Sequence, residues 1–423
     1  MISPAEAKKI AFLENMHQQF GGVSGFDTLR GQGERFLQEN DVPTTKTESW
    51  KYTRLTRIIK ESWKQGSIEG IAIENYALKE FDCYQAVFVN GQFIAAASSL
   101  PTMEGVTVQE ITSAKFAEGT EIGTLSAHEA DWMEALNARF FSTGLSIRVE
   151  KGVQVDKPIY ILEITSGNES GVFLRHHIDV ATGAEAQVVL HQATQGDDLT
   201  FSSTVTESHV AQNAVLHIDK VQENTQNHFL HATEWAAQTR DSHFDIRTVT
   251  LAGLWTRNNL NILVNGENCT TNLFGTYMPQ HKELVDNHTM VDHRVPHCES
   301  NEVYKGIVTD KATGVFNGKV FVREDAQKTN AYQQNGNIVL TDDAAMYSKP
   351  ELEIYADDVK CSHGSTTGQF DEEAVFYLRA RGLSEASARK LLVQAFISDI
   401  VDAIKPEAVR EYCLSKIESR SHQ

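Results

Sequence analysis

The sequence predicts a mainly β protein in which a β-helix core is flanked by α-helical regions on both sides. Three observations support this prediction. Between Leu145 and Tyr355, about a dozen short segments of alternating polarity follow one another, with centres roughly every 13–15 residues. No apolar stripe of helical period interrupts them. Helical patterns precede and follow this run, where they can cap the two ends of a stack of coils.

The number of segments separates a β-helix from other all-β folds. An immunoglobulin-like sandwich needs about seven to nine strands, fewer than the pattern provides. A propeller would show a repeated blade signature, which this sequence lacks. The long stretch without helices also excludes a barrel of alternating strands and helices.

Composition limits the class of protein. The chain has 423 residues, 41% of them hydrophobic, which is enough for a sizeable core. Its 38 lysines and arginines against 57 aspartates and glutamates give a net charge of −19, which argues against non-specific nucleic-acid binding. No apolar run approaches the roughly 20 residues of a membrane-spanning helix, and the first residues lack a secretory signal pattern. Five scattered cysteines without a CxxC pair indicate a reducing compartment. We therefore expect a cytoplasmic protein with neither nucleic-acid nor membrane partners.

Residues 1–75 are predicted to form an N-terminal helical region. Ser3, Pro4 and Glu6 fit the start of a helix with a capping box. Apolar residues then follow at helical spacing up to Gly21-Gly22, which ends the pattern. A second helix is expected at about 33–39, and a loop packed by its aromatic residues at 43–53.

Residues 76–144 are predicted to form a mixed α/β connecting region. Asn90-Gly91 lies between two apolar segments, which is the signature of a β-hairpin. Residues from about 125 to 141 return to helical character.

The β-helix core is predicted to span residues 145–357. Glycine or asparagine lies in many of the gaps between its segments, as expected at turns. The segments are 159–164, 173–180, 186–191, 200–205, 215–221, 229–235, 244–249, 260–264, 270–277, 284–290, 302–308 and 315–322.

The C-terminal helical domain is predicted to span residues 358–423. Asp371 fits the start of one helix, and Gly382 fits its C-terminal glycine cap. Ser384 fits the cap of the next helix, whose apolar residues recur at helical spacing. A last helix is expected to start near Pro406.

Motifs for common enzymatic chemistry are missing. The sequence contains no GxSxG elbow, no phosphate-binding GxxxxGK[ST] loop and no dinucleotide-binding GxGxxG. Four histidines and a cysteine between residues 281 and 298 raise a metal site as one hypothesis: His281, His288, His293, His297 and Cys298. Their separations cross probable turns and match no HxH or HExxH spacing. Polar residues on the outer face of a sheet are therefore the favoured interpretation.

The densest unusual segment is Lys349–Gly368, which joins the strand run to the C-terminal helices. Cys361 and His363 are two residues apart, so in an extended chain their side chains face the same way. A thiol beside an imidazole suits soft-metal binding or nucleophilic chemistry. A packed cysteine and a hydrogen-bonded histidine at a buried junction remain the alternative.

This segment and the one that follows it, up to Gly382, resemble the SufB/SufD family of iron–sulfur cluster assembly proteins. Three further matches extend the resemblance over nearly the whole chain: Pro43 to Thr53, Lys157-Pro158-Ile159, and Ser300 to Gly318. Within the family the chain looks like the SufD branch. SufB is usually longer and has an essential cysteine where this chain, in the segment Tyr332–Ile338, has Asn335.

The resemblance implies a right-handed parallel β-helix and a complex of one SufB, one SufD and two copies of the ABC ATPase SufC. In that complex the chain would be a non-catalytic scaffold subunit assisting iron acquisition. His363 matches a histidine that the family places at the SufB–SufD interface. Cys361 is the second candidate for an interface iron or cluster site, with Lys360 and Asp358 as orienting neighbours. We expect no stably bound cofactor, only transient iron or a nascent cluster shared with SufB.

SufC is expected to dock on the C-terminal helices, and a homodimer of the isolated subunit through an exposed strand edge stays open. The candidate docking residues are Phe376, Tyr377, Arg379, Arg381, Leu391, Leu392 and Phe396. Two alternatives remain: a purely structural assembly subunit without metal contact, and a β-helix carbohydrate-active enzyme, which the missing signal pattern and the free thiols disfavour.

Overall fold

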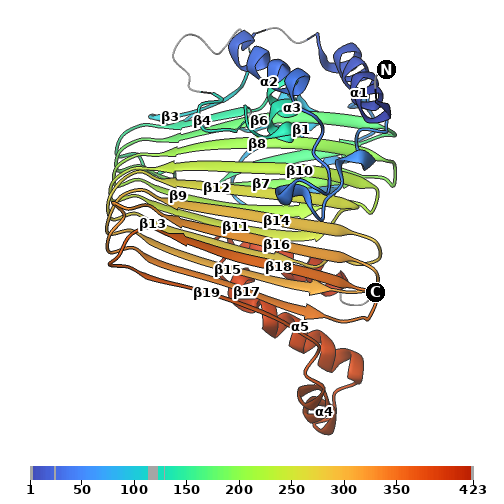
Figure 1. Ribbon diagram of the computed structural model, residues 1–423, viewed down its shortest axis with the longest axis vertical. Helices are drawn as coiled ribbons and strands as arrows, with labels where there is room; N and C mark the ends of the chain where they lie inside the picture. Colours follow the sequence, from blue (N-terminus) through green and yellow to red (C-terminus); the bar gives the residue numbers. More distant parts are fainter. Residues whose placement is uncertain (1–2, 23–24, 113–121, 128, 421–423) are drawn as a thin grey trace.

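The computed structural model describes residues 3–22, 25–112, 122–127 and 129–420. Two sheets face each other as a flattened parallel β-solenoid (Figure 1). The ten-stranded sheet has the order β19-β17-β15-β13-β11-β9-β7-β5-β1-β2, and the nine-stranded sheet has the order β18-β16-β14-β12-β10-β8-β6-β4-β3. Along the solenoid the chain therefore alternates between the sheets, one strand in each per coil. The prediction of a mainly β, parallel β-helix core with helices at both ends is confirmed.

The strands of the solenoid and its first edge are as follows: β1 (Tyr84–Val89), β2 (Gln92–Phe93), β3 (Val106–Glu110), β4 (Leu145–Val149), β5 (Ile159–Ser166), β6 (Ser170–Val180), β7 (Glu185–Gln195), β8 (Thr200–Val210), β9 (Val215–Glu223), β10 (His228–Gln238), β11 (His243–Ala252), β12 (Trp255–Val264), β13 (Thr270–Tyr277), β14 (Leu284–His293), β15 (Glu299–Val308), β16 (Thr313–Val322), β17 (Asn330–Val339), β18 (Ala345–Ile354) and β19 (Lys360–Gly368).

The turns explain why glycine and asparagine recur in the sequence. One residue with a left-handed backbone precedes each of six successive strands of the ten-stranded sheet. Glycine and asparagine adopt this conformation with the least strain, and polar residues fill the other positions. The six are Gly183, Asn213, Asp241, Asn268, His297 and Lys328.

An apolar core fills the space between the two sheets. Phe88, Ile147 and Leu190 belong to it and are buried. Because side chains alternate along a strand, every second residue points into this core and its neighbours point outward. The outward residues on both sheets then form separate layers with the terminal helices.

The N-terminal region covers the outer face of the nine-stranded sheet. It contains α1 (Pro4–Phe20), α2 (Asp27–Glu39) and α3 (Trp132–Phe140), with 3-10 turns at Glu48–Trp50 and Leu55–Arg57. Two further 3-10 turns, Ile73–Tyr76 and Ala95–Ala97, pack instead against the outer face of the ten-stranded sheet. Phe20, Trp63 and Trp132 pack in one cluster with outward aromatic residues of the solenoid such as Phe173 and Phe201.

The local predictions for this region hold in part. Ser3 and Glu6 form the predicted capping box at the start of α1. The second helix starts at Asp27, earlier than expected, and α3 starts only at Trp132. Residue 128, inside the range expected to be helical, lies outside the described residues.

The first end of the solenoid is closed by antiparallel strands. β2 pairs with β1 in the hairpin that Asn90-Gly91 predicts, and β3 pairs with β4. We call this the closed end. The other end, formed by β18 and β19, is the open end, because these are the last strands of their sheets.

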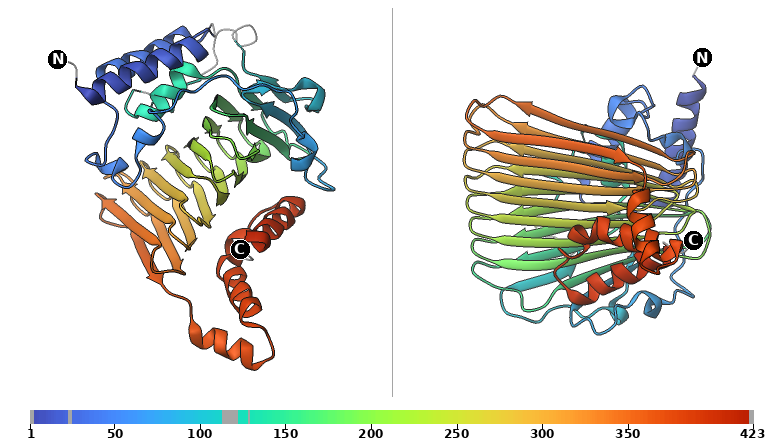
Figure 2. Two further views of the ribbon diagram at one scale, coloured as in Figure 1. Left: turned by 90° about the vertical axis from the view of Figure 1, so that its right-hand side faces the viewer. Right: turned by 90° about the horizontal axis from the view of Figure 1, so that it is seen from below.

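The C-terminal helices α4 (Glu372–Ala380), α5 (Glu385–Val401) and α6 (Glu407–Arg420) follow the last strand. Ile397 and Ile417 pack with Val221 and Val249 on the outer face of the ten-stranded sheet. Figure 2 shows these helices and the N-terminal helices on opposite sides of the solenoid. β19 ends at Gly368, so the last strand lies beyond residue 357, where the predicted core boundary falls. The segment expected to join the strand run to the helices thus contains the end of β18 and all of β19, and β19 pairs with β17 along its whole length.

None of the described helices is long and apolar enough to cross a membrane.

Candidate functional site

The open end presents two strands that each have a partner on one side only. β18 pairs with β16, and β19 pairs with β17. Their other edges carry backbone groups that can pair with a further strand. The side chains of both strands are exposed or half-buried along their whole length.

Cys361 and His363 lie on β19, beside Ala331 and Gln333 of β17. They share a face of the strand with Ser365, whose hydroxyl lies 2.7 Å from that of Ser348 on β18. This contact crosses from one sheet to the other, so the shared face is the interior of the last coil. The prediction that Cys361 and His363 face the same way agrees with the structure.

The two side chains differ in their surroundings. Cys361 is half-buried against a small apolar cluster that includes Ala331 and Val322. Burial raises the pKa of the Cys361 thiol above its ordinary value, so the thiol stays protonated near neutral pH. His363 is exposed and can offer an imidazole nitrogen to a ligand.

A buried acid, Glu302 on β15, lies two strands in from β19. Gln333 donates a 2.9 Å hydrogen bond to Glu302, which also accepts one of 2.5 Å from Thr289. Burial raises the pKa of Glu302 to about 7, against the effect of those two hydrogen bonds. The sequence offers no signal for this acid, because the three residues come from three different strands.

Asn335 is part of a buried amide network. Its Nδ2 donates to the carbonyl of Tyr304 at 3.1 Å, and its Oδ1 accepts hydrogen bonds of 2.7 Å from Asn337 and Ser348. This position therefore supplies amide groups next to the open end, where a cysteine would supply a thiol.

Aromatic and aliphatic side chains surround the open end. Tyr332, Tyr347, Ile354 and Tyr355 are all exposed. Tyr347 stacks on Tyr52 of the N-terminal loop, with 4.1 Å between ring centroids. Exposed apolar residues around unpaired strand edges are typical of a protein–protein contact surface.

The expected orienting neighbours do not act on the pair. Asp358 forms an ion pair with Lys328 in the turn before β19. Lys360 is exposed on the opposite face of β19 from Cys361.

The histidines between residues 281 and 298 do not converge on one point. His281 pairs with Asp310 at a surface turn, and His288 pairs with Asp286 on the nine-stranded sheet. His293 is buried against Ser300. In the part of the chain that the structure describes, the one group of ligands close enough for a metal ion lies elsewhere and does not include them.

The candidate docking residues fall into two groups. Phe376, Tyr377, Arg379 and Arg381 in and after α4, and Leu391 in α5, are exposed, with Phe376 at 73%. Leu392 is half-buried. Phe396 packs against the solenoid, where Lys305 Nζ lies 5.1 Å from its ring centroid.

A parallel β-solenoid with one closed end, one open end and helices along both sheets defines the structural class of this chain. Sequence comparison then identifies the family. The family model for the "SUF system FeS cluster assembly, SufBD core domain" matches residues 163–396, and that for the "SufBD protein N-terminal region" matches residues 19–161. The chain belongs to the SufBD family and is SufD-like.

Three relatives support this assignment. The chain is 33% identical over 402 residues to the iron–sulfur cluster assembly protein SufD of Escherichia coli, covering 92% of both chains. A SufBD family protein of Synechocystis is 30% identical, and the match covers 86% of this chain and 84% of the relative. One of Mycobacterium leprae is 27% identical, covering 89% and 90%.

Proposed function

We propose that this chain is a non-catalytic scaffold subunit of a cytoplasmic iron–sulfur cluster assembly complex. It pairs with a SufB-like paralogue and carries a SufC-like ABC ATPase. The observation that supports this proposal best is the open end, which combines unpaired strand edges, exposed apolar residues and the His363–Cys361 face. Free cysteines in all five positions fit a reducing compartment.

The SufB-like paralogue meets the open end. A partner with the same kind of solenoid has strand edges of its own, so pairing of edges satisfies backbone groups on both chains. The exposed residues Tyr332, Ile354 and Tyr355, which form the rim of the open end, then become buried. The same edges allow a homodimer when the paralogue is absent.

His363 and Cys361 contribute ligands for iron, or for a nascent cluster, which is the cargo of the complex. An exposed neutral imidazole binds ferrous iron readily, and a thiol binds it after losing a proton. Because the pKa of the Cys361 thiol is raised, the imidazole makes the first contact and the metal promotes loss of the thiol proton. Ligands from the paralogue complete the site.

The ATPase docks on α4 and the adjacent part of α5. Phe376, Tyr377 and Leu391 expose apolar surface there, and Arg379 and Arg381 add positive charge. ATP hydrolysis takes place on that partner, since this sequence contains no phosphate-binding loop.

The test is co-expression of the chain with a SufB-like and a SufC-like protein, followed by purification and measurement of iron and sulfide. His363→Ala should leave the complex assembled but lower its iron and sulfide content several-fold. The matched control is His297→Ala, an exposed histidine in a turn, which should change neither. Phe376→Asp should abolish co-purification of the SufC-like ATPase but leave the SufB-like protein bound.

Unchanged iron and sulfide in His363→Ala would remove the metal role and leave a purely structural assembly subunit. Retention of the ATPase by Phe376→Asp would contradict the docking surface. Failure of the wild-type chain to purify with either partner would overturn the proposed function as a whole.

A further inference from the structure

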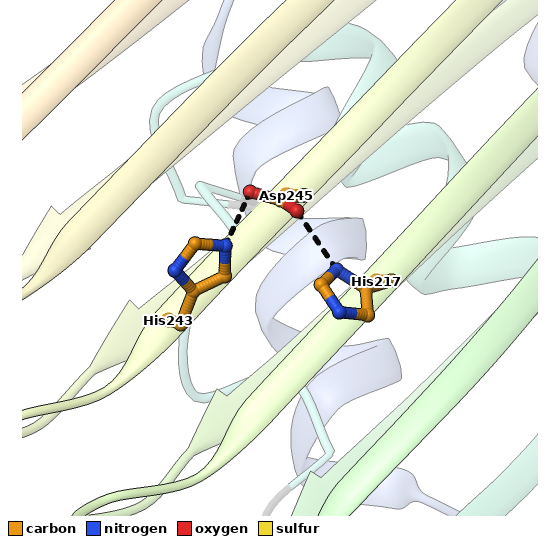
Figure 3. A group of neighbouring side chains, drawn as sticks. All are labelled: His217, His243 and Asp245. Carbon is orange, nitrogen blue, oxygen red and sulfur yellow. Dashed lines mark ion pairs between the residues drawn. The ribbon is translucent and has the colours of Figure 1, made fainter. Parts of the chain in front are cut away.

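A group of two histidines and one aspartate lies on the outer face of the ten-stranded sheet, at the beginnings of β9 and β11. His217 on β9 is in register with Asp245 on β11, and His243 is two residues before Asp245 on the same face. Figure 3 shows both imidazoles directed toward the Asp245 carboxylate. The potential ligand atoms of the three side chains all lie within 4.8 Å of one another.

The distances within this group are short. His243 Nε2 lies 2.7 Å from Asp245 Oδ1, and His217 Nδ1 lies 2.8 Å from Asp245 Oδ2. The second contact lacks the angle of a hydrogen bond, and the buried Nδ1 of His217 has no hydrogen-bond partner among the described residues. A buried ring nitrogen in this position has a lone pair available for another ligand.

The charges around the group leave the Asp245 carboxylate available to a cation. Arg247 is the nearest cation, with Nη1 3.6 Å from Asp245, but its Nε binds Asp219 at 2.5 Å. This neighbouring pair is therefore neutral as a unit. Besides Arg247, the groups that face Asp245 are the two histidines and Asn272.

We propose that His217, His243 and Asp245 bind one divalent first-row transition metal ion. Two imidazoles and one carboxylate form the donor set of mononuclear zinc and non-haem iron sites, and water fills the remaining positions. The His243 side chain is 35% exposed, so the ion can enter and His243 can adjust. Ligand atoms of a tetrahedral ion are roughly 3.3 Å apart at metal–nitrogen distances of about 2.0 Å. The 2.7 and 2.8 Å contacts must therefore widen slightly, and the other ligand atoms, which lie within 4.8 Å of one another, need only small shifts.

Asn272 on β13 positions the carboxylate. Its Nδ2 donates a 2.8 Å hydrogen bond to Asp245 Oδ1, and it lies next to Asp245 in the register of the sheet. Neighbours that hold a ligating carboxylate in one orientation typically contribute about 10- to 100-fold to metal affinity. A row of His217, Asp245 and Asn272 across three strands thus provides two ligands and their support.

This site is independent of the proposed function. It lies on the outer face of β11 and β9, which are four and five strands away from β19 in the ten-stranded sheet, whereas His363 faces the interior of the last coil. It also departs from the expectation that the chain holds no metal stably.

The experiment uses the tag-free full-length chain, stripped with a chelator and kept reduced under anaerobic conditions. Titration with Co²⁺, followed by absorption and calorimetry, should show one saturable site whose d–d bands indicate nitrogen and oxygen ligands. Zn²⁺ and Fe²⁺ should compete for it. His243→Gln and Asp245→Asn should each weaken binding about 100-fold or more, and Asn272→Ala about 10-fold. His281→Gln is the matched control, because His281 pairs with an aspartate but lacks a third ligand.

The double variant Cys361→Ser/His363→Ala should keep this site, which separates the inference from the proposed function. Three results would overturn the inference: no saturable binding, equal affinity in Asp245→Asn and wild type, or a thiolate-to-cobalt charge-transfer band. The last would place the ion on cysteines. Circular dichroism of each variant shows whether a loss of binding reflects unfolding.

Discussion

The two ends of the solenoid are built differently. At the closed end, β2 and β3 pair with the first strands, and the interior residues Phe88, Leu145 and Ile147 are fully buried. At the open end, the interior of the last coil holds only a small apolar cluster, with Leu352 and Cys361 half-buried at its margin. The interior of the solenoid is therefore fully covered at the closed end and partly accessible at the open end.

The two ends also differ in how they are covered. A terminal coil is stabilised by one neighbouring coil only, and natural solenoids normally cover it with a polar or helical cap. The C-terminal helices do not cap the open end, because α5 and α6 pack on the outer face of the ten-stranded sheet. The open end thus remains available for another chain, at the expense of local stability.

The largest expected effect is a difference in unfolding free energy between leucine truncations at the two ends. Leu145→Ala removes a fully buried side chain from the closed end and should cost about 2–5 kcal/mol. Leu352→Ala removes a half-buried side chain at the open end and should cost about 1 kcal/mol. Urea unfolding of the two variants, monitored by circular dichroism, measures both values.

Both variants replace the same side chain in a strand of the nine-stranded sheet, so each serves as the other's control. Equal destabilisation would show that the open end is as well packed as the closed end. In that case the half-burial of Leu352 would be a poor guide to its energetic role.

An intermediate effect is expected from Glu302, which lies behind the open end. The pKa of Glu302 is about 7 in the folded chain and about 4.5 when unperturbed. Folding therefore favours the protonated form of Glu302. The free energy of unfolding is highest below pH 4.5, and it falls as the pH rises from 4.5 to about 7, where the buried acid loses its proton. Glu302→Gln should remove this loss, making the variant more stable than wild type at pH 8 by at most about 3 kcal/mol.

The measurement is the urea midpoint of wild type and Glu302→Gln between pH 4.5 and 8. Glu299→Gln, an exposed position on the same strand, should keep the wild-type pH dependence. Parallel curves for wild type and Glu302→Gln would mean that water from the open end reaches this acid and keeps its pKa ordinary.

Much of the fold follows from local patterns in the sequence. Alternating segments at regular spacing predict the strands, and Ser3, Asp371 and Ser384 each cap the helix that the pattern places after them. The boundary near residue 357 does not follow from such patterns. β19 contains Gly364, Gly368 and several small polar residues, and it is a strand because β17 offers it an edge.

The candidate site was predictable only where its residues are neighbours in sequence. Cys361 and His363 are two residues apart, so strand geometry alone puts them on one face. His217 and Asp245 are separated by a full coil, and only the register of β9 with β11 brings them together. The same holds for Glu302 and Gln333. Contacts that depend on register require the length of each turn, which the sequence does not specify.

The smallest expected effect on stability, and the most direct test of the open end, comes from Ile354. Ile354→Lys places a charge on the rim of the open end, at a side chain that is already 40% exposed. The unfolding free energy should change by less than about 0.5 kcal/mol, as for most surface substitutions. Association with a SufB-like partner should weaken, since a lysine at a strand edge opposes edge pairing. Sedimentation velocity of mixtures with the partner measures this association.

The matched control is Ile68→Lys in the N-terminal region, where the isoleucine is 44% exposed. Both substitutions add the same charge at nearly the same exposure, so differences in solubility or net charge cancel. If both variants associate normally, the open end is not the contact surface, and its exposed rim needs another explanation.

If only Ile354→Lys loses association with the partner, the loss must come from the position of the residue. The unfinished coil at the open end is then completed by the partner chain, in the way that β2 and β3 complete the closed end within this chain.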